Sequence, residues 1–536
     1  MKKLKLVCVA IAMAGAAPTF AGGLLTNTNQ HVAFNRMMSR EASIGIDGVY
    51  YNPAGVVFMG DGHHLAINWQ LAYQTRTINN DYKLFTNNVN NPITPRDFKG
   101  KAFAPVIPSF QYAYNKGKWS FQANFSLTGG GGKCTFDDGL GSFEKIVSET
   151  AIAACGLAGV VDQTLGNTLG QQGMEMFTSD QAFGKTGKYS FNSYMHGRQY
   201  YYGLSAGAAY KFCNNFSAFL GVRGVYALTN YYGYVENINV GNMPLYKVLD
   251  PTKENAANIE LSCDQTGVGF TPIIGVDYKT GRWNFSAKYE FKTRIRLKNK
   301  SVNQTPSIGN LPANLANQMT GILTARYQQA GLPLEQAKQQ AENTTNTVLS
   351  DPKVGATMMG LKTQFDQKLN KAIGEYEDGK KIAGDIPGYL ALGIGYSPVD
   401  AVRVNVGFHW FDDKNATSYN NRNKELKRGT LEYNAGVEVD VNKKITLSTG
   451  WQNTNYGLSD EYMDDKSFVV SSNSAAIGGV YHINKKMDLN VAYFHTFYQH
   501  KKTSETVQLA ADKSIVYNSD YTRNNNVFAV GLDINF

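Results

Sequence analysis

The chain has 536 residues, a formal net charge of +9 and only 18% charged residues, and it contains 53 glycines, 32 tyrosines and 28 phenylalanines. Beyond the N-terminus no apolar run reaches the roughly 18 residues of a membrane helix, which argues against helical spans. Lysine and arginine are scattered, and neither zinc-ligand spacing nor a phosphate-binding glycine loop is found. We therefore expect no nucleic acid, no metal and no cofactor.

Residues 1–21 have the pattern of a removable signal peptide. Lys2, Lys3 and Lys5 precede a short apolar stretch, and Ala21 supplies the small residue before a cleavage point. The sequence therefore predicts export, with cleavage after Ala21.

Residues 22–62 show little periodicity and lie directly before the first strand pattern, where a segment can plug a barrel. Their centre is the stretch Asp47–Gly55, which ends in Asn-Pro-Ala-Gly. Pro53 fixes its own φ and moves Asn52 out of the helical region, and Gly55 can adopt angles closed to other residues. The motif predicts one rigid turn, and an ordinary surface turn is the alternative.

From residue 63 to the C-terminus, apolar and polar residues alternate with a period of two. The expected strands are 63–79, 103–115, 118–134, 199–212, 216–236, 262–279, 283–300, 386–397, 401–413, 429–441, 445–455, 472–483, 487–503 and 523–536. Such a chain is all-β, either a secreted soluble sandwich or a transmembrane barrel. Repetition over fourteen strands favours an antiparallel membrane barrel with apolar residues facing lipid and charges facing a wet lumen.

The strand 283–300 has the clearest pattern. One face carries Trp283, Phe285, Ala287, Tyr289, Phe291, Ile295 and Leu297, and the other carries Asn284, Ser286, Lys288, Glu290, Lys292, Arg294 and Arg296. The first face is expected to contact lipid and the second to line the lumen.

The connections between strands alternate between six tight turns and seven longer excursions. This is the rhythm of bacterial outer-membrane barrels, in which the short turns are periplasmic. An even strand number places both termini on that side. The last strand ends at Phe536, with Phe528, Val530, Leu532 and Ile534 on the same face. It resembles the signal read by the outer-membrane insertion machinery, so we expect that machinery, outer-membrane lipid and a Gram-negative outer membrane as the protein's surroundings.

Two excursions, about 135–198 and 301–385, contain helical patterns. Apolar residues of the second fall near one helical face: Leu311, Leu315, Met319, Ile322, Leu323 and Tyr327. The helices either pack on each other as a cap or leave a groove that accepts an apolar ligand. In an oxidising compartment Cys134 and Cys155 could form a disulfide, whereas Cys213 lies at the opposite end of the barrel.

These features together resemble the FadL/TodX family of outer-membrane transporters for long-chain fatty acids and other hydrophobic molecules. The resemblance covers the mature chain, and its specific parts are Asp47–Gly55, the following Val-Val-Phe-Met, and the strand-turn-strand segment 387–408. Residues 34–43 contain less alanine and glycine than the family pattern, which bears on ligand identity.

The resemblance implies that the N-terminal segment is a hatch, with gate residues Asp47, Asn52, Pro53, Ala54 and Gly55. It also implies that a ligand lands on an external groove, enters an interior pocket and leaves sideways where the third strand bends inward. By position this bend falls at Gly129, Gly130, Gly131 and Gly132, because consecutive glycines weaken strand pairing. A flexible loop entrance is the alternative reading of the four glycines.

A fatty acid would also need cations or hydrogen-bond donors for its carboxylate. Strand parity and the hatch give the candidates Arg36, Arg40, Arg223, Lys288, Arg294 and Arg403, which lumen acids such as Glu290, Glu432 and Glu438 could neutralise. The leading hypothesis is passive uptake of fatty acids, or of aromatic hydrocarbons. A surface adhesin or structural barrel is the alternative. A lipid enzyme is not expected, because neither His409 nor His495 has an evident serine and acid partner.

Overall fold

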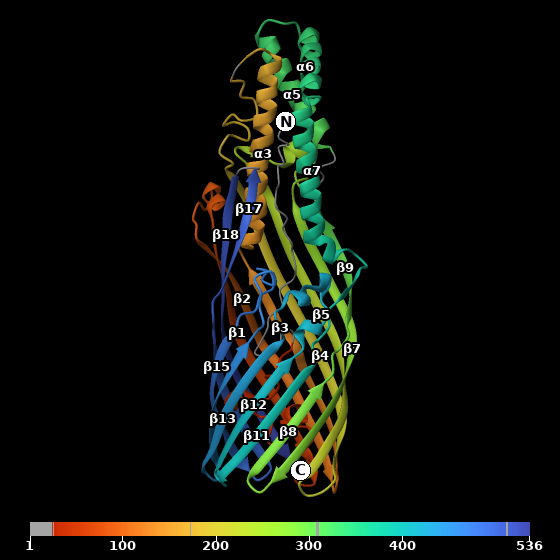
Figure 1. Cartoon of the computed structure of the whole chain (residues 1–536), viewed down its shortest axis with the longest axis vertical. Helices are drawn as coiled ribbons and strands as arrows, with labels where there is room; N and C mark the ends of the chain where they lie inside the picture. Colours follow the sequence, from red (N-terminus) through yellow and green to blue (C-terminus); the bar gives the residue numbers. More distant parts are fainter. Residues whose placement is uncertain (1–23, 25, 172, 307–309, 511–512) are drawn as a thin grey trace.

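The computed structural model describes residues 24, 26–171, 173–306, 310–510 and 513–536. Within these residues one antiparallel sheet closes on itself, because β1 (Gly62–Tyr82) pairs with both β2 (Arg96–Lys116) and β18 (Lys513–Asn535). Helices rise above one end of the barrel, and the C-terminus lies at the other end (Figure 1). The expected fourteen-stranded antiparallel barrel is confirmed. The signal peptide at 1–21 lies outside the described residues.

The other strands of the wall follow in chain order. They are β3 (Trp119–Phe136), β4 (Tyr189–Lys211), β5 (Phe216–Val240), β7 (Ile259–Thr280), β8 (Trp283–Glu290), β11 (Tyr389–Val399), β12 (Val402–Phe411), β13 (Thr430–Asn442), β14 (Ile445–Asn455), β15 (Ser472–Asn484) and β16 (Met487–Tyr498). Four further strands extend the sheet: β6 (Met243–Pro244), β9 (Arg296–Gln304), β10 (Lys381–Ala383) and β17 (Lys501–Ala510). Each expected strand is found, although those at 283–300 and 487–503 are each interrupted, and several continue farther toward the helical end, as β4 does by beginning at Tyr189.

The outer surface of the wall is apolar. Large side chains that alternate with buried residues remain exposed, among them Leu220 (68%) and Phe270 (71%). A closed sheet that turns apolar side chains outward and polar ones inward is the architecture of Gram-negative outer-membrane barrels, since no backbone edge is left in the lipid. Phe536 ends the chain at the edge of this surface, 65% exposed.

The strand expected at 283–300 is interrupted. Beyond the interruption, the side chains face the opposite way from the prediction made from the sequence. Pairing with β7 shifts by one residue between the pairs Ile273–Glu290 and Thr266–Lys298. A one-residue slip exchanges the two faces of everything beyond it. Ile295 is therefore buried, and Arg294 points outward rather than into the lumen. Leu297 is buried and Arg296 is exposed for the same reason.

The long helices form a cap above the barrel. They are α3 (Gly141–Thr168), α5 (Leu311–Gln329), α6 (Leu334–Leu349) and α7 (Pro352–Ile373). Of the residues expected to line an open groove, Leu311, Leu315, Met319 and Leu323 are instead buried in the apolar core shared by these helices, and Ile322 is 36% exposed. Packing between helices removes these side chains from water. Four of the five predicted groove residues therefore belong to the packed core of the cap. Although α3 is long and apolar enough to cross a membrane, half of its most apolar window is buried inside the protein.

Shorter helical turns complete the structure. They are α1 (Val32–Met37), α2 (Gly48–Tyr51), η1 (Gly55–Phe58), η2 (Lys83–Asn87), α4 (Tyr246–Leu249), η3 (Gly374–Tyr376), η4 (Asp413–Asn415) and η5 (Tyr419–Glu425). Cys134 in β3 and Cys155 in α3 are both free thiols, so the disulfide considered from the sequence is not formed.

Candidate functional site

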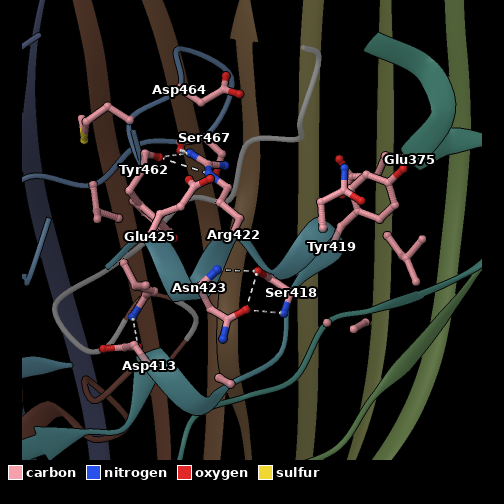
Figure 2. Close-up of a pocket in the computed structure, with 18 of the residues that line it drawn as sticks. Glu375, Asp413, Ser418, Tyr419, Arg422, Asn423, Glu425, Tyr462, Asp464 and Ser467 are labelled. Carbon is pink, nitrogen blue, oxygen red and sulfur yellow. Dashed lines mark hydrogen bonds between the residues drawn. The ribbon is translucent and has the colours of Figure 1, made fainter. Parts of the chain in front are cut away.

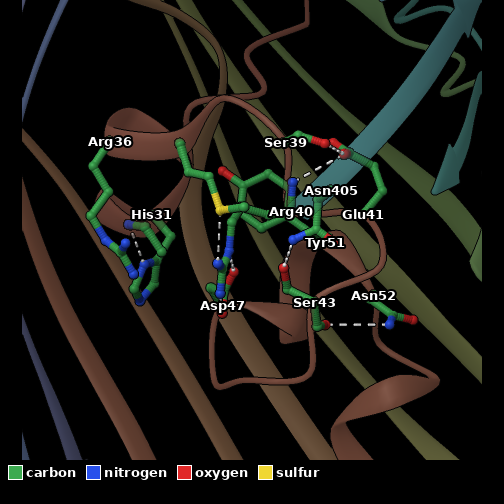
Figure 3. Close-up of polar contacts among 12 residues, drawn as sticks. His31, Arg36, Ser39, Arg40, Glu41, Ser43, Asp47, Tyr51, Asn52 and Asn405 are labelled. Atoms are coloured by element: carbon green, nitrogen blue, oxygen red, sulfur yellow. Dashed lines mark hydrogen bonds and ion pairs between the residues drawn. The ribbon is translucent and has the colours of Figure 1, made fainter. Parts of the chain in front are cut away.

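The N-terminal segment, residues 26–62, lies inside the barrel, and residues 26–57 are almost entirely buried. Its short helices α1 and α2 are joined by a loop whose side chains contact one another and the barrel wall (Figure 3). His31 caps α1 by accepting a hydrogen bond from the Ala33 N–H at 2.9 Å. The segment thus forms a folded plug made of short turns, and we call it the plug below.

The Asn-Pro-Ala-Gly turn holds the plug to three strands near their periplasmic ends. Asn52 Nδ2 donates to Asp277 of β7 at 2.6 Å. The carbonyl of Pro53 accepts from Gln122 of β3, and that of Ala54 accepts from Ser217 of β5, both at 2.7 Å. These bonds satisfy backbone groups that are buried away from water.

The need for glycine at position 55 has a different cause from the one expected. Gly55 is absent from the residues with positive φ, so the turn does not require left-handed backbone there. A Cβ at this position would lie 2.3 Å from Asn52 Nδ2 and 3.1 Å from Asp277 Oδ2. A larger residue at this position would therefore displace the Asn52 amide that anchors the turn.

Ion pairs join the plug to the wall on one side of the lumen. Arg36 binds Glu438 of β13 at 2.6 Å, and Arg40 binds Asp47 at 2.7 Å and Glu438 at 3.4 Å. Arg403 of β12 binds the same Glu438 at 2.7 Å and Asp440 at 2.6 Å. The gate candidate Asp47 thus serves to hold Arg40, and Glu438 is shared by three guanidinium groups.

A second group of ion pairs lies around Tyr50 of α2. Glu290 binds Arg223 at 2.6 Å and Lys288 at 2.9 Å, and Lys288 also donates to the Tyr50 carbonyl at 2.6 Å. The Lys288 ammonium lies 4.3 Å from the centre of the Tyr50 ring, a cation–π contact. Of the six cations expected to meet a ligand, five are therefore matched by acids and Arg294 points outward.

His409 of β12 is part of a third link between plug and wall. Its Nε2 lies 2.7 Å from Glu41 of the plug, and its Nδ1 lies 2.8 Å from Glu432. All three side chains are buried. Among the residues that the structure describes, the ring's partners are Glu41, Glu432 and Asn434, and the bond to Glu41 anchors the plug to β12.

The wall has a break in hydrogen bonding between β2 and β3. These strands pair at Phe103–Lys133 and again at Phe110–Phe125, and residues 104–109 and 126–132 between those pairs are not in register. Two residues of the β2 stretch, Pro105 and Pro108, have no N–H to donate. The four glycines expected at a kink lie in this stretch of β3, inside the strand rather than at its end.

The plug occupies the inner side of this break. Asn27 donates from its backbone to Thr128 O at 3.0 Å and from its side chain to Gly130 O at 2.7 Å. Gln30 donates to Leu127 O at 2.7 Å and accepts from Ser109 of β2 at 2.6 Å. The plug therefore binds backbone carbonyls of the β3 stretch that has no register with β2.

Gly130 is expected to be the least replaceable residue of the glycine run. Its φ is +72°, and a Cβ there would lie 2.3 Å from the Gln199 carbonyl oxygen. We expect Gly130→Ala to destabilise the barrel by more than the roughly 1–2 kcal/mol of left-handed strain alone. Gly117→Ala is the matched control, because Gly117 has φ +61° and no atom within 4 Å of the added Cβ. The measurement is the temperature at which the folded band is lost in heat-modifiability gels, and equal losses would contradict the steric argument.

A cavity of about 570 Å³ lies below the cap, lined by the start of α3, barrel strands and the segments around η3, η4 and η5. Its lining mixes apolar and aromatic side chains with charges, including Tyr201, Tyr231, Leu297, Ile382 and Arg422. Arg422, in η5, donates to the carbonyls of Tyr462 and Ser467 (Figure 2). In the described part of the chain, Arg422 forms no ion pair with an acid, although it lines a cavity large enough for a small molecule.

Glu375 lies across the same cavity from Arg422, next to Tyr419 (Figure 2). Burial raises the pKa of its carboxyl to about 7. Asp464, Lys466, Arg422 and Lys380 are the charged groups that also act on it. The cavity therefore combines a guanidinium that has acids nearby but none in a direct ion pair, and an acid whose pKa is raised to about 7.

Arg422 and Glu375 were missed in the sequence because both lie in irregular loops. The alternation of strand residues cannot predict which way a loop side chain points, and neither residue is part of a motif. The cations that the sequence predicted to bind a ligand headgroup therefore all lie in the strands or in the plug.

No protein-family model and no curated protein sequence matches the chain. Solved structures do match it. The crystal structure of a Pseudomonas aeruginosa FadL homologue is 13% identical, covers 96% of this chain and 100% of that chain, and has a TM-score of 0.58. A deltaS2S3 mutant of TodX, a monoaromatic hydrocarbon channel, is 14% identical, covers 94% and 99% of the two chains, and has a TM-score of 0.50. The chain therefore has the fold of the FadL and TodX channels, as its motifs predict.

Proposed function

We propose that this protein is a passive outer-membrane channel for hydrophobic small molecules, with long-chain fatty acids as the first candidate substrates. A molecule enters the cavity below the cap, displaces part of the plug and leaves toward the membrane through the break between β2 and β3. The observation that supports the proposal is this break, because its inner side is covered by the plug and its strands are not paired across it. Ile107 and Leu127 give it an apolar lining, together with Phe34 and Tyr51 of the plug.

Arg422 is the residue that favours an amphiphile with an acidic headgroup over a neutral hydrocarbon. A hydrogen bond between charged groups stabilises binding by about 1.5–3 kcal/mol, and Arg422 has no direct ion pair to break first, although Asp464, Glu375 and Glu425 lie near it. The matched cations of the lumen would instead have to break ion pairs first. Aromatic hydrocarbons remain the second candidate class, since Tyr201, Tyr231 and Tyr419 offer rings without requiring charge.

The test of the channel is uptake of labelled oleate and labelled toluene by cells with and without the gene. Faster uptake of either compound in cells that carry the gene supports a channel, and equal rates for both compounds would refute it. Adhesion of the same cells to surfaces, measured with cap-deleted protein, separates the channel from a surface adhesin.

Arg422→Gln is expected to weaken oleate binding by roughly tenfold to a hundredfold, the equivalent of the lost charged hydrogen bond. Toluene binding should stay within about twofold, because no charge is involved. Lys424→Gln, an exposed lysine in the same η5 turn, is the matched control. The measurement is equilibrium binding to purified protein in neutral detergent. Equal effects on both ligands would show that Arg422 does not select the headgroup.

Oleate binding is also expected to be tighter at pH 6 than at pH 8. Below its pKa of about 7, Glu375 is neutral, and above that value its negative charge repels a carboxylate near Arg422. At an effective dielectric near 20 such repulsion across a cavity amounts to roughly 1 kcal/mol, several-fold in affinity. Glu375→Gln should reduce this pH dependence, leaving the part that comes from Asp413 and Asp465, whose pKa values are raised to about 6 by burial, and an unchanged profile in the variant would contradict the assignment.

A further inference from the structure

The interruption between β8 and β9 places a row of cations on the outer surface of the barrel. Arg294, Arg296, Lys298 and Lys300 all face outward and are exposed, and Asn299, between two of them, is buried. Alternate residues of a strand are about 7 Å apart, so the four charges form a line about 20 Å long. We call these four residues, with Lys381 of β10, the basic stripe.

Two lysines of the basic stripe face each other across neighbouring strands. Lys381 is directly opposite Lys298 in the antiparallel pair of β10 and β9. Like charges directly opposite each other destabilise a sheet, so this arrangement calls for an anion between them. No acid in the described part of the chain forms an ion pair with Arg294, Lys298, Lys300 or Lys381.

The acids on the neighbouring segments have other partners. Asp385 binds Arg296 at 2.8 Å, which leaves the other four cations of the stripe unmatched. Asp264 is across from Lys300 but accepts from Asn230 at 2.8 Å. Asp378 accepts from the Ser301 N–H at 2.8 Å. Because Asn230 is neutral, Asp264 keeps its charge beside Lys300, so Arg294, Lys298 and Lys381 are the cations that an anion from outside the chain would match.

The stripe begins where the apolar outer surface ends. On β7, Val268 is 66% exposed and Phe270 is 71% exposed. The carbonyls of Arg294 and Arg296 lie against the neighbouring Gly269 and Gly267 of that strand. β9 lies at the helical end of the wall, below α7 (Figure 1). An occupant therefore needs acyl chains for the apolar surface and phosphates just above them.

We propose that the basic stripe binds the phosphorylated glycolipid of the outer leaflet, of the lipid A class, with its phosphates on the arginine and lysine side chains and its acyl chains on Val268 and Phe270. Arginine and lysine are the side chains that bind phosphate most strongly, and clusters of them at a membrane surface recognise anionic headgroups. The inference does not depend on which substrate the channel carries.

The test uses full-length purified protein in neutral detergent and native mass spectrometry with three probes: bisphosphorylated lipid A, the same lipid without phosphates, and phosphatidylglycerol. The stripe variant carries Arg294→Gln, Lys298→Gln, Lys300→Gln and Lys381→Gln. The control variant carries four glutamines in the exposed periplasmic turns, at Lys443, Lys444, Lys485 and Lys486, and has the same change in net charge.

We expect lipid A binding to fall at least about tenfold in the stripe variant and to stay within about twofold in the control. Wild-type binding should need the phosphates, should exceed binding of phosphatidylglycerol and should weaken as salt rises. Equal losses in both variants, no loss in either, or equal binding of phosphatidylglycerol would overturn the proposal. Should the stripe variant fail to fold, the double variant Lys298→Gln, Lys381→Gln and the phosphate-free probe decide the outcome in the same way.

Discussion

Replacing Glu438 by glutamine is expected to loosen the plug and to open a water path through the lumen. Glu438 is buried and binds Arg36, Arg40 and Arg403, so the change leaves buried guanidinium charge without its acid. Breaking a buried pair by removing one partner costs about 3–5 kcal/mol. Arg36 should be affected most, because Arg40 retains Asp47 and Arg403 retains Asp440.

The measurements are single-channel conductance in planar bilayers and the rate at which a protease cleaves the N-terminal segment of the purified protein. Both should rise in the Glu438→Gln variant while the barrel itself stays folded. Glu342→Gln is the control, since Glu342 is an exposed acid of α6. Wild-type conductance and wild-type cleavage in the Glu438 variant would show that this ion-pair network does not hold the plug.

The wall of the barrel could be predicted because its signal is local. Alternation with a period of two fixes which residues share a face, and one buried or lipid-exposed face is enough to set the register. The prediction was wrong where a bulge intervened, as at Arg294, because a slip of one residue leaves the composition of the strand unchanged. Proline and glycine mark such places, and Pro272 of β7, whose carbonyl accepts from Phe291 N–H at 3.0 Å, lies beside this one.

The candidate site was less predictable because its contacts join distant parts of the chain. Asn52 and Asp277 are 225 positions apart, and Glu41 and His409 are 368 apart. No periodicity encodes such pairs, so the motif Asn-Pro-Ala-Gly indicated a rigid turn without indicating its partners. The helices of the cap were predicted as helices, but the sequence could not decide between an open groove and packing in a core, since both use an apolar stripe.

Restoring backbone donors to β2 is expected to close the break in the wall and to stop uptake. Pro105→Val together with Pro108→Val gives the strand two new N–H groups and residues that favour extended structure. In a regular strand, the backbone N–H groups of residues three positions apart point toward opposite neighbouring strands. One of the two new donors therefore faces β3, and the other faces β1. A carbonyl of the β3 stretch 126–132, where Leu127 and Gly130 are now bound by the plug, would then have a competing partner in β2.

Uptake of labelled oleate by cells that carry the double variant should fall at least about tenfold if the break is the exit, which corresponds to a barrier raised by about 1.4 kcal/mol or more. Hydrogen exchange of residues 104–109 and 126–132 should slow at the same time, which reports that the ladder has formed. Pro398→Val, at the periplasmic end of β11, is the matched control. Slowed exchange with wild-type uptake would place the exit elsewhere, because a sheet hydrogen-bonded across this stretch leaves a hydrophobic molecule no route between β2 and β3.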